Sequence, residues 1–196
     1  MSLEYRNQLV DAAVSAQPKL SAFIKEGSSN GLQMLGNWDV IALGFSKAFE
    51  ILWDHAKVDP SGLLLQPLLT LWRQSIELSI KAALVEIEGQ LEPGYGHNIE
   101  ALFERLSLVL TELGYSQDDD ELAQGVRAML TEVQALDRSA DRFRYPETKS
   151  GKTFEPVDTD LDMLFQAHLL ITFYCNAAGD QVADNRQIEY EMRETK

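Results

Sequence analysis

The sequence has little cysteine, no long apolar run and no secretory signal, and each absence narrows the class of protein. A single cysteine, Cys175, excludes an intramolecular disulfide and a thiolate metal cluster, and it suits a reducing compartment. The longest largely apolar stretches, Gly62 to Trp72 and Leu169 to Ala178, are shorter than the about 18 residues that span a bilayer. Met1 to Val14 lacks the basic flank and apolar core of a signal peptide. We therefore expect a cytoplasmic protein without a membrane segment.

Positive charge is also scarce, with 17 lysines and arginines against 31 acidic residues, a net charge of −14. Such a charge repels phosphate backbones and anionic membrane surfaces. We expect no DNA contact over most of this acidic surface, and any contact with nucleic acid must be local. The acidity by itself indicates solubility rather than a specific partner.

Common catalytic and metal motifs are missing as well. The sequence has no phosphate-binding glycine loop, no nucleophile elbow and no HExxH motif. His55 and His168 have no second ligand at helical spacing, and the acidic run Asp118 to Glu121 lacks the alternating pattern of an EF-hand. That run favours the start of a helix instead. We expect no metal site and no cofactor.

Helical periodicity dominates what is present, and strand-like alternation is nearly absent. The sequence predicts an all-α, up-and-down bundle of five to six helices around one long central helix, as a single domain over residues 1–196. The N-terminal helices occupy residues 1–57. The predicted helices are Leu3 to Ile24 with a break near Pro18, Trp38 to Lys57, Pro60 to Gly89, Asn98 to Gly114, Asp118 to Arg142, and one starting near Asp158.

Several local signals support these boundaries. Asn37 and Asn98 are predicted N-caps, and Gly114 is a predicted helix stop. The segment from Pro60 to Gly89 is the longest and most apolar, so we expect it at the centre of the bundle. Pro146 to Pro156 reads as an exposed loop or short hairpin. Residues 179–196 are polar, and we expect this tail to fray.

Three charged residues of the predicted central helix lie on one stripe. Arg73, Glu77 and Lys81 follow each other at intervals of four residues, beside the apolar face. They form either a surface salt-bridge ladder or a partly buried cluster that needs specific partners. His97, just before the Asn98 cap, either packs or takes part in acid-base chemistry.

The most basic segment runs from Arg138 to Lys152. Five basic residues against two acidic ones give it a local charge of +3 in a chain of −14. Arg142 and Arg144, with Phe143 and Tyr145 for stacking, suit a phosphate or carboxylate ligand. The same arginines equally suit ion pairs with their own fold or with a second subunit.

Three pieces in this order resemble the HEPN family (higher eukaryotes and prokaryotes nucleotide-binding) of helical domains. The pieces are Arg73 to Leu84, Gly96 to Leu102 and Asp141 to Pro146, and the resemblance covers residues 60–178. In the middle piece, Gly-His-Asn-Ile stands where such domains often have Gly-His-Asp-Leu.

The resemblance implies a helical bundle that dimerises and that binds nucleotide or RNA, or cleaves RNA. It points to a ligand site of Arg73, Glu77, Lys81, His97, Asn98, Arg142, Arg144 and Tyr145. Ribonuclease members carry an arginine four to six residues before a histidine, and none of the three histidines here has one. A binding module, a metal-independent ribonuclease with a rearranged site and a dimeric scaffold therefore stay as alternatives.

Overall fold

The computed structural model describes residues 2–16, 37–92, 94–116 and 120–194. It groups the chain into two compact units, Met1–Leu35 and Gly36–Lys196, and each is described by itself. In the first unit, α1 spans Leu3–Ala16, and its expected continuation past Pro18 lies outside the described residues. The single domain expected over 1–196 stays a prediction.

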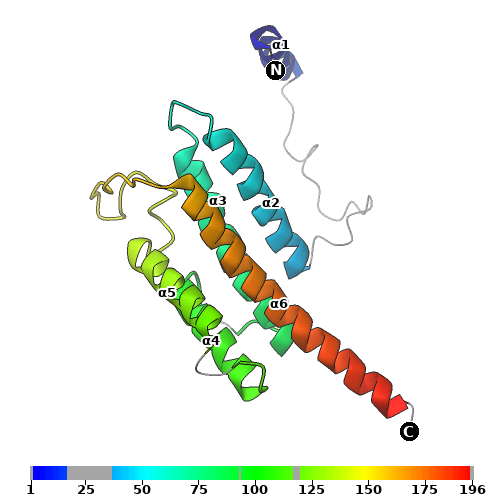
Figure 1. Ribbon diagram of the computed structural model, residues 1–196. Helices are drawn as coiled ribbons and strands as arrows, with labels where there is room; N and C mark the ends of the chain where they lie inside the picture. Colours follow the sequence, from blue (N-terminus) through cyan, green and yellow to red (C-terminus); the bar gives the residue numbers. More distant parts are fainter. Residues whose placement is uncertain (1, 17–36, 93, 117–119, 195–196) are drawn as a thin grey trace. The chain divides into compact units, whose positions relative to one another are not determined.

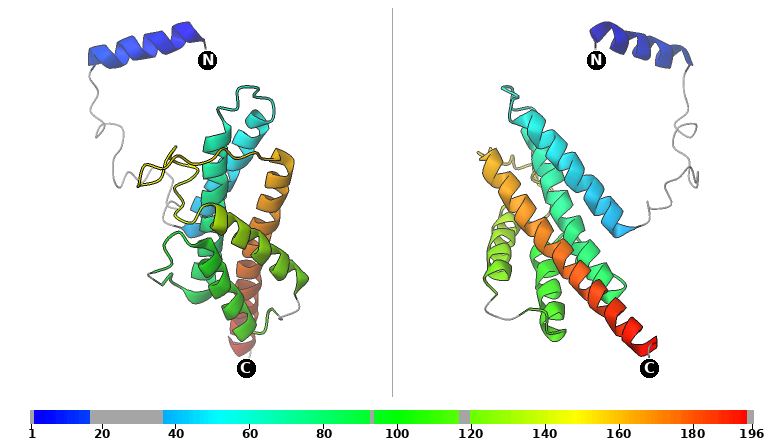
Figure 2. Two further views of the ribbon diagram at one scale, coloured as in Figure 1. Left: turned by 90° about the vertical axis from the view of Figure 1, so that its left-hand side faces the viewer. Right: turned by 45° about the vertical axis from the view of Figure 1, so that its right-hand side comes forward.

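The second unit is an all-α bundle of five helices, which confirms the predicted fold class (Figure 1). No β-strand occurs in the described part of the chain. The helices are α2 Trp38–Ala56, α3 Leu65–Glu88, α4 Ile99–Glu112, α5 Glu121–Leu136 and α6 Leu161–Glu194. Figure 2 shows α2, α3 and α6 side by side, with α4 and α5 packed on another side. None of these helices combines the length and apolarity needed to cross a membrane.

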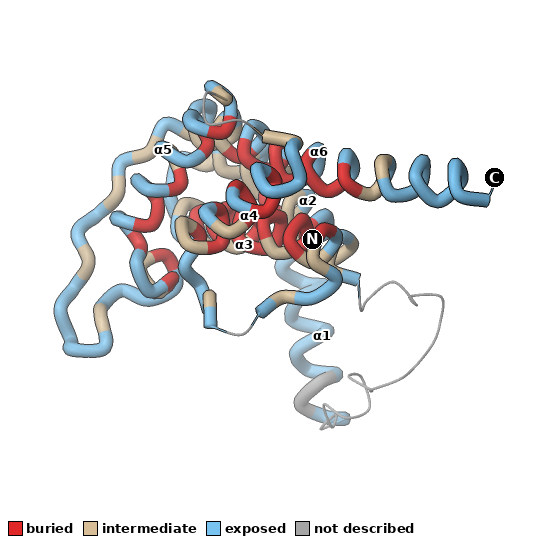
Figure 3. Tube along the Cα trace, turned by 90° about the horizontal axis from the view of Figure 1, so that it is seen from below, coloured by how far each residue is buried: buried red, intermediate tan, exposed pale blue. Residues whose placement is uncertain are grey.

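The α3 helix is the centre of the bundle, as predicted. It contacts α2, α4 and α6, whereas α5 closes the bundle against α4 and α6. Figure 3 shows buried residues along α3, and they include Leu68, Ile76, Ile80 and Leu84, which are fully buried. The expectation that α3 is also the longest helix is wrong, because α6 has 34 residues and α3 has 24.

The predicted caps and stops are confirmed. The Asn37 side chain accepts a hydrogen bond from the Asp39 amide at the start of α2, and Asn98 accepts one from Ala101 at the start of α4. Gly89 and Gly114 follow α3 and α4 with positive φ angles of 81° and 77°, a backbone conformation that glycine adopts without strain.

Two predicted boundaries are wrong because side chains form competing turns. Before α3, the Asp59 carboxylate accepts hydrogen bonds from the amide and hydroxyl of Ser61, so the helix begins at Leu65 and not at Pro60. After α5, Asp137 accepts from the Arg142 amide, and the helix ends at Leu136 rather than near Arg142. Ala140, inside this turn, has a φ of 57°.

The prediction for the loop after α5 is confirmed, and the prediction for the C-terminal tail is wrong. Residues 146–156 form an exposed loop with one antiparallel bridge between Glu147 and Thr153, as predicted. The predicted fraying of the tail is wrong for residues 179–194, because α6 continues to Glu194, and residues 195–196 lie outside the described residues. Arg186 anchors this extension by donating to the carbonyls of Glu86 and Ile87 at the end of α3, at 2.9 and 2.5 Å.

Candidate functional site

The charged stripe of α3 forms a buried cluster centred on one carboxylate. Glu77 is 1% exposed, and its Oε1 accepts from Lys81 Nζ at 2.7 Å. Both Glu77 oxygens lie near Nδ1 of His97, at 3.0 and 3.1 Å. The guanidinium of Arg73 is 3.4 Å from Glu77 Oε2. We call Arg73, Glu77, Lys81, His97 and Gln134 the Glu77 network; it is not a solvated surface ladder.

Arg73 is the most constrained member of this network. It is 3% exposed, and its guanidinium donates to the His97 carbonyl at 2.5 Å and to Oε1 of Gln134 at 3.3 Å. Burial lowers the pKa of Arg73, while the charges of Glu77 and Asp137 act in the opposite direction. These partners offset the cost of burying the charged guanidinium. Arg73 therefore ties α3 to the loop before α4.

Gln134 of α5 completes the network, although it is absent from the residues predicted from sequence. Its Oε1 accepts from the Ile99 amide at 3.0 Å, and its Nε2 donates to the Arg138 carbonyl at 2.9 Å. Gln134 is 7% exposed in an otherwise apolar stripe of α5. A glutamine in an apolar stripe is visible in the sequence. Because a buried amide needs hydrogen-bond partners, that position could have indicated a polar contact.

His97 and Asn98, adjacent in sequence, have different surroundings. The Asn98 side chain is occupied as the cap of α4. The His97 ring is held at Nδ1 by Glu77, yet the side chain is 52% exposed. A carboxylate on Nδ1 fixes the orientation and tautomer of an imidazole, so Nε2 is the nitrogen left for solvent or a ligand.

The predicted arginines of the basic segment line a separate open pocket of about 370 Å³. Arg142 and Arg144 share this pocket with Tyr145, Phe154 and the carboxylate-bearing Glu155. We call it the arginine pocket. The Arg142 guanidinium lies 5.6 Å from the Phe154 ring centre and donates to the Glu155 carbonyl at 2.9 Å. No ion pair involves either arginine in the part of the chain that the structure describes.

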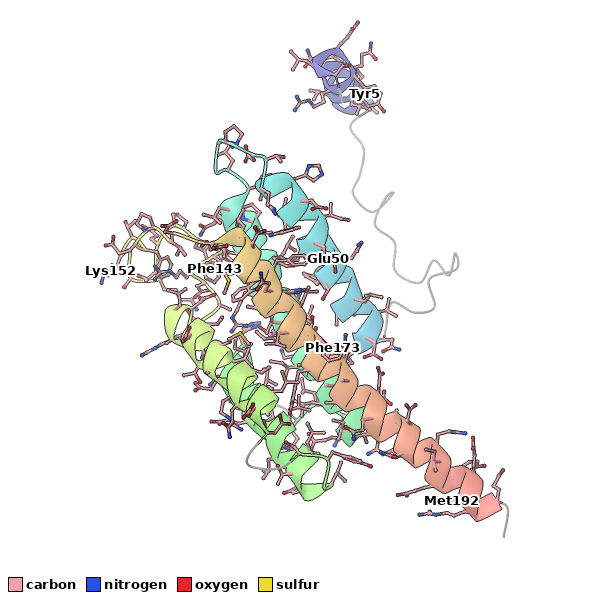
Figure 4. All side chains as sticks on the ribbon, in the orientation of Figure 1. Tyr5, Glu50, Phe143, Lys152, Phe173 and Met192 are labelled. Carbon is pink, nitrogen blue, oxygen red and sulfur yellow. The ribbon has the colours of Figure 1, made fainter. Side chains whose placement is uncertain are left out.

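Three polar residues in the first three turns of α3 hold the arginine pocket in place. Gln66 donates to the Arg142 carbonyl at 2.9 Å, Thr70 donates to the Phe143 carbonyl at 2.6 Å, and Gln74 accepts from Arg144 at 2.9 Å. Phe143 is buried beneath this segment, and Figure 4 labels it close to the helices, with Lys152 out at the loop tip. The backbone of the pocket is therefore fixed, while Arg144 and Tyr145 stay exposed.

The predicted ligand residues thus fall into two groups rather than one pocket. Glu77 and His97 converge within hydrogen-bonding distance, together with Arg73 and Lys81. Arg144 does not join them, because its guanidinium bonds Gln74 on α3. Arg142 and Tyr145 share the pocket with Arg144.

His168 and Cys175 belong to the core. His168 is 1% exposed, and its Nε2 lies 2.7 Å from the Ser75 hydroxyl. Burial lowers the pKa of His168 to about 4 and raises the pKa of the Cys175 thiol to about 12. The thiol is therefore protonated at neutral pH and packs as an apolar group. Among the described residues, no three His, Cys, Asp or Glu side chains group as metal ligands do.

Comparison with protein-family models, with curated proteins and with solved structures finds no match to this chain. Function must therefore be inferred from the chemistry of the two polar groups themselves.

Proposed function

We propose that this chain is a HEPN-like helical binding module that takes a phosphate-bearing ligand, a nucleotide or an RNA end, in the arginine pocket. One observation carries the proposal: two arginines that pair with no carboxylate among the described residues line a preformed pocket beside exposed aromatic surface. In a chain of net charge −14, such a local pair of cations offers an anion a site that the rest of the surface does not.

The pocket has the chemistry that a nucleotide needs. Guanidinium groups bind phosphate oxygens through paired N–H donors, and aromatic rings stack on bases. Arg144 supports this role because its side chain is exposed at the pocket. Tyr145 is 55% exposed, so its ring is open to a base. A volume of about 370 Å³ lies within the range of small-ligand sites.

The same contacts argue against a purely structural role for these arginines. If Arg142 and Arg144 were purely structural, we would expect them to form internal ion pairs, as Arg73 does with Glu77. Instead their described contacts are to neutral groups, the Glu155 carbonyl and the Gln74 amide oxygen. The HEPN resemblance adds a homodimer to the proposal, which sedimentation equilibrium measures directly.

Titration calorimetry with nucleoside mono- and diphosphates and with a 5′-phosphorylated short RNA tests the proposal. We expect saturable binding that Arg142→Ala/Arg144→Ala abolishes. The matched control is Arg138→Ala/Lys149→Ala, which removes two charges from the same basic segment outside the pocket lining. Absence of binding, or equal loss in both double variants, contradicts the proposal.

The geometry of His97 favours a second candidate function, metal-independent cleavage of RNA. The Glu77 carboxylate orients the ring through Nδ1, and the half-exposed Nε2 has the position of a general acid or base. In this scheme Nε2 takes the proton of the 2′-hydroxyl as its oxygen bonds to phosphorus, and the protonated ring returns it to the 5′-oxygen as the P–O5′ bond breaks. Arg142 and Arg144, which line a separate pocket, would hold another phosphate of the same RNA. Cleavage of a mixed RNA pool that His97→Ala abolishes and His55→Ala leaves intact supports it; full activity of the His97 variant refutes it.

A further inference from the structure

A second and larger concavity lies on the bundle, away from both polar groups. This groove, of about 670 Å³, has α3 as its floor and α2 and α6 as its walls. Small residues line much of it, among them Ala82 and Ala83 of the α3 floor and Gly179 of the α6 wall. Figure 4 labels Glu50 on α2 and Phe173 on α6, two of the lining residues, where these two helices face each other. We call this feature the α2–α6 groove.

The groove is elongated in the way a helix requires. Its α2 wall runs from Asp39 to Glu50 and its α6 wall from His168 to Ala183. At 1.5 Å per residue these walls are about 16 and about 22 Å long. The groove between α2 and α6, above α3, therefore has room for one face of an additional helix of about three turns.

Large apolar side chains on the rim are exposed in the second unit. Leu43 is 69% exposed and Phe173 is 66% exposed, on opposite walls, and Leu169 is 46% exposed. The hydroxyls of Ser79 and Thr172 in the lining donate to carbonyls of their own helices. These two hydroxyls are therefore satisfied within their helices, and the apolar rim suits an apolar helix face.

The charge of the groove selects the kind of helix. Four carboxylates, those of Asp39, Glu50, Glu86 and Asp180, line it, and no lysine or arginine of the described residues does. Glu50 is paired with Lys47, while the other three carboxylates have no ion pair with a described residue. These carboxylates disfavour the docking of an acidic helix in this groove and favour a basic one. We propose that the α2–α6 groove binds a basic amphipathic helix of a partner protein.

Fluorescence anisotropy with the full chain tests this proposal. The probe is a fluorescein-labelled 14-residue peptide with leucine and lysine at amphipathic helical spacing. A peptide of scrambled order has the same composition and charge, and a leucine and glutamate peptide keeps the helical pattern with the opposite charge. We expect one-to-one binding of the first peptide and at least about tenfold weaker binding of the other two.

Paired variants locate the binding site. Leu43→Ala/Phe173→Ala should weaken binding about tenfold, and Leu108→Ala/Leu136→Ala, which truncates two exposed leucines of α4 and α5, should not. Glu86→Gln/Asp180→Asn should weaken it several-fold and reduce its salt dependence. Glu104→Gln/Glu132→Gln removes the same charge elsewhere and should have no effect. Arg142→Ala/Arg144→Ala should also leave it unchanged, because this groove is independent of the arginine pocket.

Three results overturn the proposal. Equal binding of the scrambled peptide, or equal loss in the control pairs, means nonspecific attraction to an acidic protein. No binding of the helical peptide by the folded chain means that the groove does not accept a basic helix. A dimer in sedimentation that Phe173→Ala dissociates means that a second copy covers the groove.

Discussion

The Glu77 network and the arginine pocket both attach to α3, and they use arginine in opposite ways. Arg73 is buried, is paired with Glu77 and bonds the backbone of a neighbouring loop. Arg142 and Arg144 lie outside the bundle, with only neutral partners. The same side chain is thus committed to the fold in one place and left available in the other. Burial and carboxylate partners separate the two roles.

Removal of Glu77 should have the largest effect on this comparison. Glu77→Ala leaves Arg73 buried without its carboxylate, and we expect a loss of about 3–5 kcal/mol in the free energy of unfolding, measured by urea titration. The control is Glu88→Ala, on the same helix as Glu77. It breaks a more exposed ion pair with Arg105 of α4 and should cost about 1 kcal/mol. Equal losses in the two variants would show that the Glu77 network is not structural.

A buried histidine extends the comparison to pH. Burial lowers the pKa of His168 to about 4 from its ordinary 6.5, so the folded chain holds it neutral. Between these values the unfolded chain binds the proton and the folded chain does not. Stability from His168 is therefore full above pH 6.5 and falls as the pH drops toward 4, by about 2 kcal/mol from pH 7 to pH 5.

Urea titration at pH 7 and pH 5 measures this term. The variant His168→Gln lacks the titrating ring, so its stability should change by about 2 kcal/mol less than that of the parent over the same interval. Carboxylates contribute equally to both proteins and cancel in the difference. Identical pH dependence of the two proteins would contradict the buried, neutral state of His168.

Asn98 was predicted as a ligand residue, but in the structure its side chain caps α4. Asn98→Ala should lower stability by about 1 kcal/mol through the loss of its bond to the Ala101 amide. Asn98→Asp keeps a capping oxygen and should preserve stability. Thermal unfolding followed by circular dichroism distinguishes these outcomes; an unchanged Ala variant would return Asn98 to the ligand candidates.

Local signals explain which parts of the fold were predictable. Asn37 and Asn98 cap helices through residues two or three positions away, so sequence alone indicates them. The extension of α6 depends on Arg186 reaching the end of α3, and the Glu77 network depends on Gln134, 61 residues from Arg73. Periodicity and capping patterns do not encode such distant contacts, and the turn at Asp137 likewise overrode an otherwise helical stretch.

The smallest expected effect belongs to the arginine pocket itself. Arg142→Ala/Arg144→Ala removes an exposed contact with Gln74, a hydrogen bond to the Glu155 carbonyl and a contact with Phe154. The pocket backbone keeps its anchors to Gln66 and Thr70, so urea titration should show a loss of about 1 kcal/mol or less. A loss near that of Glu77→Ala would mean that these arginines serve the fold as Arg73 does. A small loss would show that the fold does not depend on Arg142 and Arg144, in contrast to Arg73, and would agree with a role in ligand binding.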